Sequence, residues 1–351
     1  MSWLEHLGVT RPIIQAPMAG VSTPELAAAV SNAGGLGSIG VGGTDAPSAR
    51  SMIEATRALT GGAFNVNVFV HRSPRPDPAR EEAWLDALRP LFQEFSSAPP
   101  TTLSPSFRSF AEDDDMLDAL IEAAPPVVSF HLGLPDSARI AALRAVGCVL
   151  LASVTSLAEG ELAQQAGLDA VVAQGFEAGG HRGVFSAEAR DDMLGTVALT
   201  TLLLARLDLP VIAAGGVMDG HGIGSMIGLG ATAVQMGTAF IACPESSADE
   251  AFRAALAGTG GQHTTMTTAI SGRPARCVAN RFTAWACDHV LTPPQFPLAF
   301  KASKALNAAA RAAGDPGFGA HWAGQGAPLH RPMAAGTLVD LLEEERTSSH
   351  R

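Results

Sequence analysis

The sequence contains no tyrosine and few cysteines, namely Cys148, Cys243, Cys277 and Cys287. Tyrosine is a common side chain for proton transfer, so another residue type must do this work here. No two cysteines form a Cys-x-x-Cys pair, and Cys148 precedes an apolar run that indicates a buried strand. We therefore expect neither a disulfide nor a zinc site.

Long apolar runs and positive charge are also scarce. No run reaches the roughly 18–20 apolar residues of a membrane-spanning helix, and the N-terminus lacks the pattern of a signal peptide. The 34 Asp and Glu outnumber the 23 Lys and Arg, which gives a formal net charge of -11. This charge disfavours contact with a phosphate backbone. We expect a cytoplasmic protein that binds a small molecule, without a nucleic-acid or membrane partner.

What the sequence does contain is an alternation of short apolar runs with alanine-rich segments of helical period. Such alternation predicts parallel strands joined by helices, and eight runs predict an α/β fold of the TIM (β/α)8 barrel type. The predicted strands are Ile13 to Ala16, Gly37 to Val41, Phe64 to Phe69, Val127 to Leu132, Val149 to Ser153, Ala170 to Gln174, Val211 to Ala214, and Ala233 to Met236.

Helices are expected between these strands, and Thr23 followed by Pro24 is a typical helix start. The proline- and acid-rich stretch of residues 99–115 predicts an exposed loop. After Phe240 the alternation stops, which predicts a smaller C-terminal lid domain. The expected division is a barrel over 1–243, the lid over 244–315 and a returning segment over 316–351. The predicted helices are Pro24 to Ala33, Ala46 to Leu59, Pro78 to Phe95, Ser137 to Ala145, Leu157 to Gln165, Leu199 to Leu207, Asp249 to Ala257, and Gly336 to Arg346.

One predicted strand end carries the clearest chemical signal. The run that ends at Gln174 is followed by a turn with Gly179, Gly180 and His181. Active sites of such barrels lie at the carboxyl ends of the strands, and histidine exchanges protons near neutral pH. The two glycines would allow a planar ligand to approach the backbone. The alternative is a turn histidine that only bonds to backbone.

Two more glycine turns follow the seventh and eighth predicted strands. Gly215 and Gly216 come after the seventh, while Gly237 and Thr238 come after the eighth. The loops after these two strands commonly bind phosphate through backbone N–H groups. A pair of turns one βα unit apart favours a phosphate site over plain tight turns.

Other strand ends offer small or amide side chains. The first strand ends in uncharged residues, namely Ala16, Pro17 and Met18, so the backbone there could lie against a ring system. Asn67 and Gln174 are amides in strands, and buried amides need hydrogen-bond partners, which the edge of an isoalloxazine ring could supply. An internal network of amides would satisfy them equally well.

Together these motifs resemble the nitronate monooxygenases, formerly called 2-nitropropane dioxygenases, and in particular the bacterial class I members. The resemblance extends over nearly the whole chain, from the start to the end. The motifs that carry it are residues 15–24 (QAPMAGVSTP), 65–67 (NVN), 130–135 (FHLGLP), 173–183 (AQGFEAGGHRG), 213–216 (AAGG), 235–238 (QMGT) and 322–326 (WAGQG).

The resemblance implies a barrel that holds FMN non-covalently. His181 would be the catalytic residue, in contact with the substrate's nitro group and able to remove the α-proton of a neutral nitroalkane. It further implies that an alkyl nitronate, such as propionate 3-nitronate, is oxidised with O2 to a carbonyl compound and nitrite through a flavosemiquinone. A homodimer is a further hypothesis. The residues expected to bind FMN are Ala16, Pro17, Met18, Asn67, Gln174, Gly179, Gly180, Gly215, Gly216, Gln235, Gly237 and Thr238.

The chain departs from the family at Phe296, where a tyrosine often precedes the proline, so a hydroxyl contact is lost there. Arg182 is the nearest cation to His181 in sequence, although a structural ion pair would explain it as well. Two alternatives stay open: an FMN-dependent NAD(P)H reductase on the same scaffold, acting on an enoyl-acyl-carrier protein or a quinone, and a non-catalytic flavin carrier or sensor. No GxGxxG fingerprint follows a strand, which is weak support against the reductase.

Overall fold

The structure is a computed structural model that describes residues 3–289 and 291–348. The outer limits of the predicted division, residues 1 and 351, lie outside this range. Eight parallel strands form one sheet in the order β1-β9-β8-β6-β5-β4-β3-β2. A bridge between Ile14 and Leu36 brings the first and last of them together, so the sheet curls into a barrel. The strands are β1 (Ile13–Gln15), β2 (Gly37–Gly40), β3 (Phe64–Phe69), β4 (Val127–His131), β5 (Val149–Val154), β6 (Ala170–Gln174), β8 (Val211–Ala214) and β9 (Ala233–Met236).

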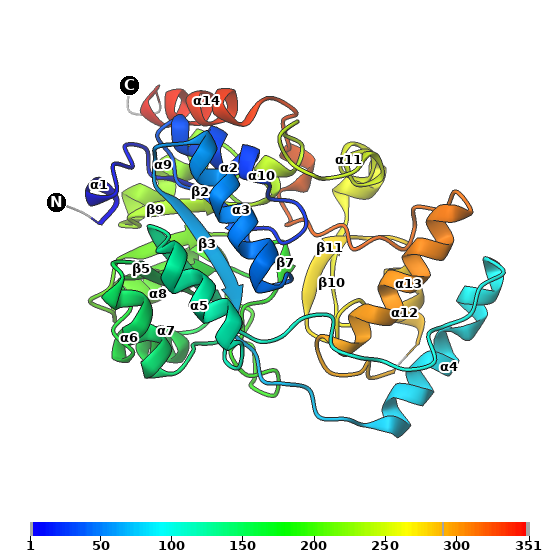
Figure 1. Ribbon diagram of the computed structural model, residues 1–351. Coiled ribbons are helices and arrows are strands. Elements are labelled where there is room, and N and C mark those ends of the chain that lie inside the picture. Colours follow the sequence, from blue (N-terminus) through cyan, green and yellow to red (C-terminus); the bar gives the residue numbers. More distant parts are fainter. Residues whose placement is uncertain (1–2, 290, 349–351) are drawn as a thin grey trace.

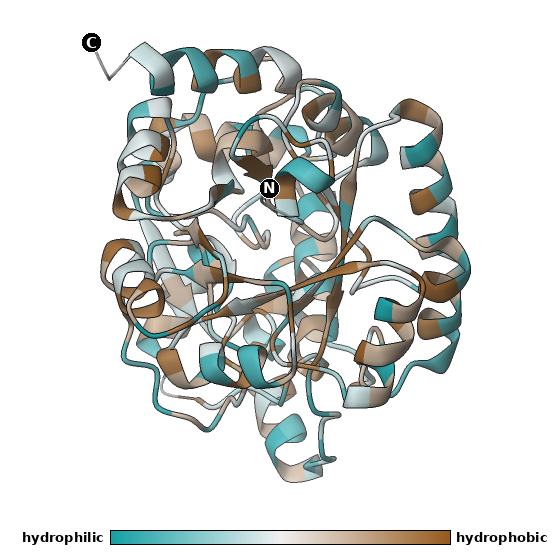
Figure 2. Ribbon diagram, turned by 90° about the vertical axis from the view of Figure 1, so that its left-hand side faces the viewer, coloured by the Kyte–Doolittle hydropathy of each residue, from teal (hydrophilic) through white to brown (hydrophobic). Residues whose placement is uncertain are grey.

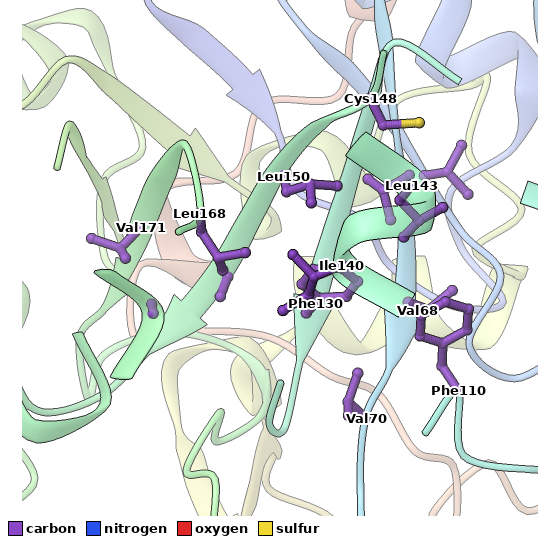
Figure 3. Close-up of a cluster of buried hydrophobic side chains, with 14 of the residues drawn as sticks. Val68, Val70, Phe110, Phe130, Ile140, Leu143, Cys148, Leu150, Leu168 and Val171 are labelled. Atoms are coloured by element: carbon purple, nitrogen blue, oxygen red, sulfur yellow. The ribbon is translucent and has the colours of Figure 1, made fainter. Parts of the chain in front are cut away.

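The predicted TIM barrel is therefore confirmed, and each predicted strand begins at the residue where the structure begins it. These strands are nearly continuous apolar runs because both of their faces are buried. Figure 3 shows part of the core between strands and helices, where Val68, Phe130, Leu150 and Val171 pack together with Cys148. In Figure 2 the helices carry both hydrophilic and hydrophobic residues, as expected for helices with one buried side.

Helices cover the outside of the barrel (Figure 1). Most of them begin at a Thr, Ser or Asp whose side chain accepts a hydrogen bond from the third helical N–H, as at Thr23 and Asp45. The C-terminal helix α14 packs against both α9 and α2. These helices are α1 (Trp3–His6), α2 (Pro24–Asn32), α3 (Ala46–Leu59), α5 (Asp114–Ala123), α6 (Ser137–Ala145), α7 (Leu157–Gln165), α8 (Thr196–Leu204), α9 (Gly220–Leu229), α10 (Thr238–Ile241) and α14 (Ala335–Ser348).

Two longer barrel helices, α5 and α9, and the four-residue helices α1 and α10 were not predicted, and one helix was misplaced. Helix α5 begins at Asp114, within the last two residues of the predicted exposed loop, and α9 contains four glycines, which lower helix propensity. Helix α8 begins at Thr196, three residues before the predicted start, because Glu177 accepts hydrogen bonds from the Thr196 N–H and hydroxyl.

A second unit, called the lid unit below, lies at one side of the barrel (Figure 1). It contains β10 (Thr264–Thr267), β11 (Ala275–Val278), α12 (Arg281–Asp288) and α13 (Leu298–Ala312), and α11 (Glu250–Ala257) lies near it. Strand β11 also pairs with β7 (Gly180–His181), a two-residue strand that leaves the barrel.

Helix α4 (Pro78–Glu94) belongs to the lid unit by its packing, although it precedes β4 in sequence. Its residues Trp84, Leu88 and Phe92 share one buried cluster with Phe282 of α12 and Leu306 of α13. The predicted division at residue 243 did not foresee this insertion, because the apolar pattern of a helix does not say which partner it will cover. No helix in the described part of the chain is long and apolar enough to cross a membrane.

The docking of α4 can be tested with Leu88→Ala, since this side chain is fully buried in the lid cluster. Removing it should lower the free energy of unfolding by about 2–5 kcal/mol, through lost burial and the cavity left behind. The matched control is Leu162→Ala, whose side chain is 51% exposed on α7. Urea unfolding measures both variants. Equal effects would show that α4 does not pack against the lid unit.

Candidate active site

A cavity of about 540 Å³ lies at the carboxyl ends of the barrel strands, between the barrel and the lid unit. This volume is typical of sites for a cofactor or a drug-sized ligand, which span about 300–1,000 Å³. All the residues that the sequence predicted for FMN binding or catalysis line this one cavity: Ala16, Pro17, Met18, Asn67, Gln174, Gly179, Gly180, His181, Gly215, Gly216, Gln235, Gly237 and Thr238. Their individual roles stay predictions.

The two predicted phosphate turns have backbone N–H groups without partners. None of the described residues accepts a hydrogen bond from the N–H of Gly216, Gly237 or Thr238. A Cβ atom at Gly237 would meet nothing closer than 3.4 Å, so the backbone there is open to a ligand. Unpaired N–H groups at neighbouring strand ends fit a phosphate.

The turn after β8 needs glycine for its own shape. Gly215 and Gly216 have φ of 119° and 74°, in the left-handed region that other residues rarely adopt. A Cβ atom on Gly215 would also lie 2.8 Å from the Thr196 hydroxyl. That hydroxyl lies 2.9 Å from both the Gly215 carbonyl oxygen and the Glu177 carboxylate, which share its one hydrogen, so the turn is held from behind.

The glycine at position 179 is explained by a crossing of two chain segments. A Cβ atom there would lie 2.5 Å from the Gly324 nitrogen, and one on Gly324 would lie 2.6 Å from the Glu177 carbonyl oxygen. The Gly324 N–H donates to the Thr238 hydroxyl at 2.9 Å, which leaves the hydroxyl hydrogen available to a ligand. The segment 322–326 therefore closes over both the histidine turn and the second phosphate turn.

Residues 16–18 run along the cavity wall, positioned by Ser22. Its hydroxyl accepts hydrogen bonds from the Met18 N–H and from the Gln15 amide, both at 2.9 Å. Gln15 in turn accepts from the Ser38 N–H on β2 at 2.8 Å. This backbone is fixed without using a charged side chain, in line with the sequence prediction.

The two predicted amides both have protein partners. Asn67 donates to the Ser129 carbonyl at 3.0 Å and hydroxyl at 2.9 Å. Gln174 donates to the His181 carbonyl at 2.9 Å and accepts from the Gly183 N–H at 2.7 Å. The internal hydrogen-bond network, which the sequence left open as an alternative to ligand contact, is thus present. Both residues still line the cavity.

His181 is held at the cavity by its backbone and by aromatic neighbours. Its carbonyl also accepts a hydrogen bond from His131 Nε2 at 3.0 Å. Its ring lies 5.2 Å from Phe296 and from Trp322, and 6.2 Å from Phe69, measured between centroids. Phe296, the departure from the family pattern, therefore packs directly on the candidate catalytic residue without a hydroxyl.

The two histidines stay neutral at physiological pH. Burial lowers the pKa of His181 to about 3, because a buried imidazolium is poorly solvated. The nearby side chains of His131 and Arg273 lower this pKa further. Burial likewise lowers the pKa of His131 to about 4. A neutral imidazole can accept a proton, and an anion bound beside it raises the pKa again because it stabilises the imidazolium.

Arg182 makes the structural ion pair weighed in the sequence. Its Nε lies 2.8 Å from Asp191 Oδ2 and its Nη2 lies 3.0 Å from Asp191 Oδ1. The side chain is only 2% exposed, so this pairing offsets the cost of burying the charge.

One wall of the cavity consists of residues to which the sequence assigned no role. Helix α13 contributes Phe300, Lys304, Asn307 and Arg311, which recur every three or four residues and so share one helical face. The spacing was visible in the sequence, but not its partner. His131 and Phe107 were also not selected, although His131 lies in one of the motifs quoted above and both line the cavity.

Fold and site together define a TIM-barrel protein with a cofactor-sized cavity at its catalytic end. A family model described as nitronate monooxygenase matches residues 2–345. The chain belongs to the nitronate monooxygenase family, whose members are flavin-dependent oxidoreductases.

Individual relatives agree with this assignment. The chain is 55% identical over 347 residues to a nitronate monooxygenase of Paraburkholderia phytofirmans, covering 99% of this chain and 95% of that one. It is 54% identical over 340 residues to one of Pseudomonas aeruginosa, covering 97% of each. Among solved structures, nitroalkane oxidase from Streptomyces ansochromogenes has a TM-score of 0.91 and 38% identity, with 99% of both chains covered. FabK from Thermotoga maritima has a TM-score of 0.73 and 29% identity, covering 99% of this chain and 96% of that one.

The pKa of His131 leads to a stability prediction. The unfolded chain binds a proton on this histidine below about pH 6.5, and the folded chain only below about pH 4. Stability should therefore fall as the pH drops through this window, because the unfolded state binds more protons. The variant His131→Gln keeps a donor for the His181 carbonyl but cannot titrate. Its free energy of unfolding should therefore fall less steeply with decreasing pH, by up to about 1.4 kcal/mol per pH unit.

Urea unfolding at several pH values between 7 and about 4.5 measures this difference. The control is His289→Gln, because His289 is exposed on the surface of the lid unit. Parallel curves for wild type and His131→Gln would contradict the assigned burial.

Proposed function

We propose that this protein is an FMN-dependent nitronate monooxygenase. In this proposal it oxidises alkyl nitronates, such as propionate 3-nitronate, and neutral nitroalkanes, with O2 to carbonyl compounds and nitrite. The observation that carries the proposal is the meeting of His181 with the two candidate phosphate turns at one cavity, in a chain 54–55% identical to nitronate monooxygenases. The proposal also includes a cytoplasmic homodimer.

The backbone N–H groups of Gly216, Gly237 and Thr238 would hold the phosphate of FMN, since none has a protein partner among the described residues. The ring and ribityl chain would contact Met18, Asn67, Gln174, Gly179 and Gly180. Bound FMN would accept electrons from the substrate, while the protein provides binding, orientation and electrostatics.

His181 acts on the substrate's α-carbon when the substrate arrives as a neutral nitroalkane. The neutral imidazole takes the α-proton, and the electron pair of the broken C–H bond remains on the nitronate. A preformed nitronate needs no proton removal. The buried charge of Arg273, which already disfavours a second positive charge on His181, favours an anion at the same place.

The reductase alternative has less support. FabK is 29% identical to this chain, against 54–55% for the nitronate monooxygenases. The aromatic surroundings of His181, with Phe69, Phe296 and Trp322, also favour a small substrate near the histidine over a large polar dinucleotide.

His181→Ala tests the role of the histidine. Turnover of a neutral nitroalkane should fall by about 10²–10⁴-fold, the usual contribution of a general base, while the purified variant keeps its flavin. Oxygen uptake and nitrite release measure turnover, and the visible spectrum measures flavin content. His289→Ala is the control, being an exposed histidine of the lid unit. Loss of flavin with His181→Ala would make the histidine structural instead.

Gly237→Asp tests the phosphate turns. The new carboxylate would lie beside the phosphate, so repulsion and bulk should release FMN. The control Gly61→Asp introduces the same charge in a surface turn where a Cβ meets nothing within 4 Å. Flavin content after gel filtration, with the flavin identified by mass after acid release, is the readout. Full FMN retention in Gly237→Asp would exclude this pocket.

A further inference from the structure

Ser271 lies directly behind the candidate catalytic histidine. Its hydroxyl oxygen is 2.9 Å from His181 Nε2, and the residue is completely buried. It stands on the turn between β10 and β11, so it comes from the lid unit, while His181 comes from the barrel. The turn is tightly enclosed, because a Cβ atom on Gly272 would lie 2.2 Å from the Pro294 carbonyl oxygen.

The serine hydroxyl has one hydrogen and three polar neighbours. Besides His181 Nε2, they are the Arg273 carbonyl oxygen at 3.2 Å and the Arg273 nitrogen at 3.4 Å. The Arg273 N–H can only donate, so the hydroxyl accepts from it. The hydroxyl hydrogen must therefore point either to the Arg273 carbonyl or to the imidazole.

The Arg273 carbonyl is the better acceptor for the Ser271 hydroxyl hydrogen. No other described residue donates to the Arg273 carbonyl, and Arg273 is only 4% exposed. A buried carbonyl left without a donor is costly. If the hydroxyl donates to the carbonyl, it accepts from His181 Nε2–H, and all three groups are satisfied.

The other ring nitrogen of His181 opens onto the cavity. Nδ1 has no partner among the described residues, and it is not one of the fully buried atoms without a partner. Since the side chain lines the cavity, this accessible nitrogen faces the substrate.

We propose that Ser271 is a positioning residue that holds neutral His181 with its hydrogen on Nε2, so that the lone pair of Nδ1 faces the substrate and takes the α-proton. The inference rests on the proposed function. When the α-carbon–hydrogen bond breaks, its electron pair stays on the nitronate and the proton goes to Nδ1. Nε2–H continues to donate to Ser271, now as a charge-assisted bond. No rearrangement of the serine is needed.

Ser271→Ala removes the acceptor without touching the substrate. The kcat/KM for a neutral nitroalkane should fall by about 10–100-fold, because a base in mixed tautomers and orientations loses part of its contribution. With the corresponding preformed nitronate the loss should be clearly smaller. The ratio of the two is the readout, and Ser271→Thr, which keeps the hydroxyl, should restore it.

The matched control is Ser303→Ala. Ser303 is also buried, and its hydroxyl donates to the Ile270 carbonyl at 2.7 Å, next to Ser271 but away from His181. A purely structural role of Ser271 would lower both activities equally, as we expect for Ser303→Ala, and this result would overturn the proposal.

A second measurement is independent of turnover and reads the tautomer in the wild-type protein. The ¹⁵N shifts of histidine-labelled wild type, with His181 assigned by comparison with His181→Gln, should show a protonated Nε2 and a bare Nδ1. The reverse tautomer would overturn the proposal. Failure of the proposed function is distinguishable, because wild type would then oxidise neither substrate while these shifts still report the tautomer.

Discussion

The site depends on the carbonyl oxygen of His181. This atom accepts hydrogen bonds from Gln174 at the end of β6 and from His131 at the end of β4. The short strand β7, which contains His181, pairs at the same time with β11 of the lid unit. Two barrel strands and the lid unit thus fix one backbone position. The His181 imidazole therefore enters the cavity with little conformational freedom, and general base catalysis requires such fixed geometry.

The same contacts explain why the barrel and the lid unit form a single site. Ser271 approaches His181 from the lid unit, and the segment around Gly324 crosses the histidine turn where neither Gly179 nor Gly324 has room for a side chain. The two predicted phosphate turns follow β8 and β9, so they lie on barrel elements alone. We infer that the barrel determines where a flavin binds, whereas the lid unit and the closing segment determine how the histidine meets a substrate.

The sequence predicted the barrel well because buried parallel strands are short apolar runs with glycine or proline at their ends, and such runs need no knowledge of their partners. It also selected residues that line one cavity, since active sites of this fold lie at the strand ends. Long-range pairing was not predictable in this way. The two-residue strand at Gly180–His181 has no period, α9 is rich in glycine, and the apolar face of α4 gave no sign that it packs on α13. Ser271 lies 90 residues from His181 in sequence, so only the fold brings them together.

The central claim is that this cavity holds a flavin that is reduced by a nitronate. The most direct measurement mixes the purified flavoprotein, without oxygen, with propionate 3-nitronate and, separately, with NADH and NADPH, while the flavin spectrum is recorded. The account predicts that the nitronate alone changes the flavin spectrum to that of a reduced form. Full reduction by a nicotinamide, with no response to the nitronate, would contradict it and place the protein among the reductases.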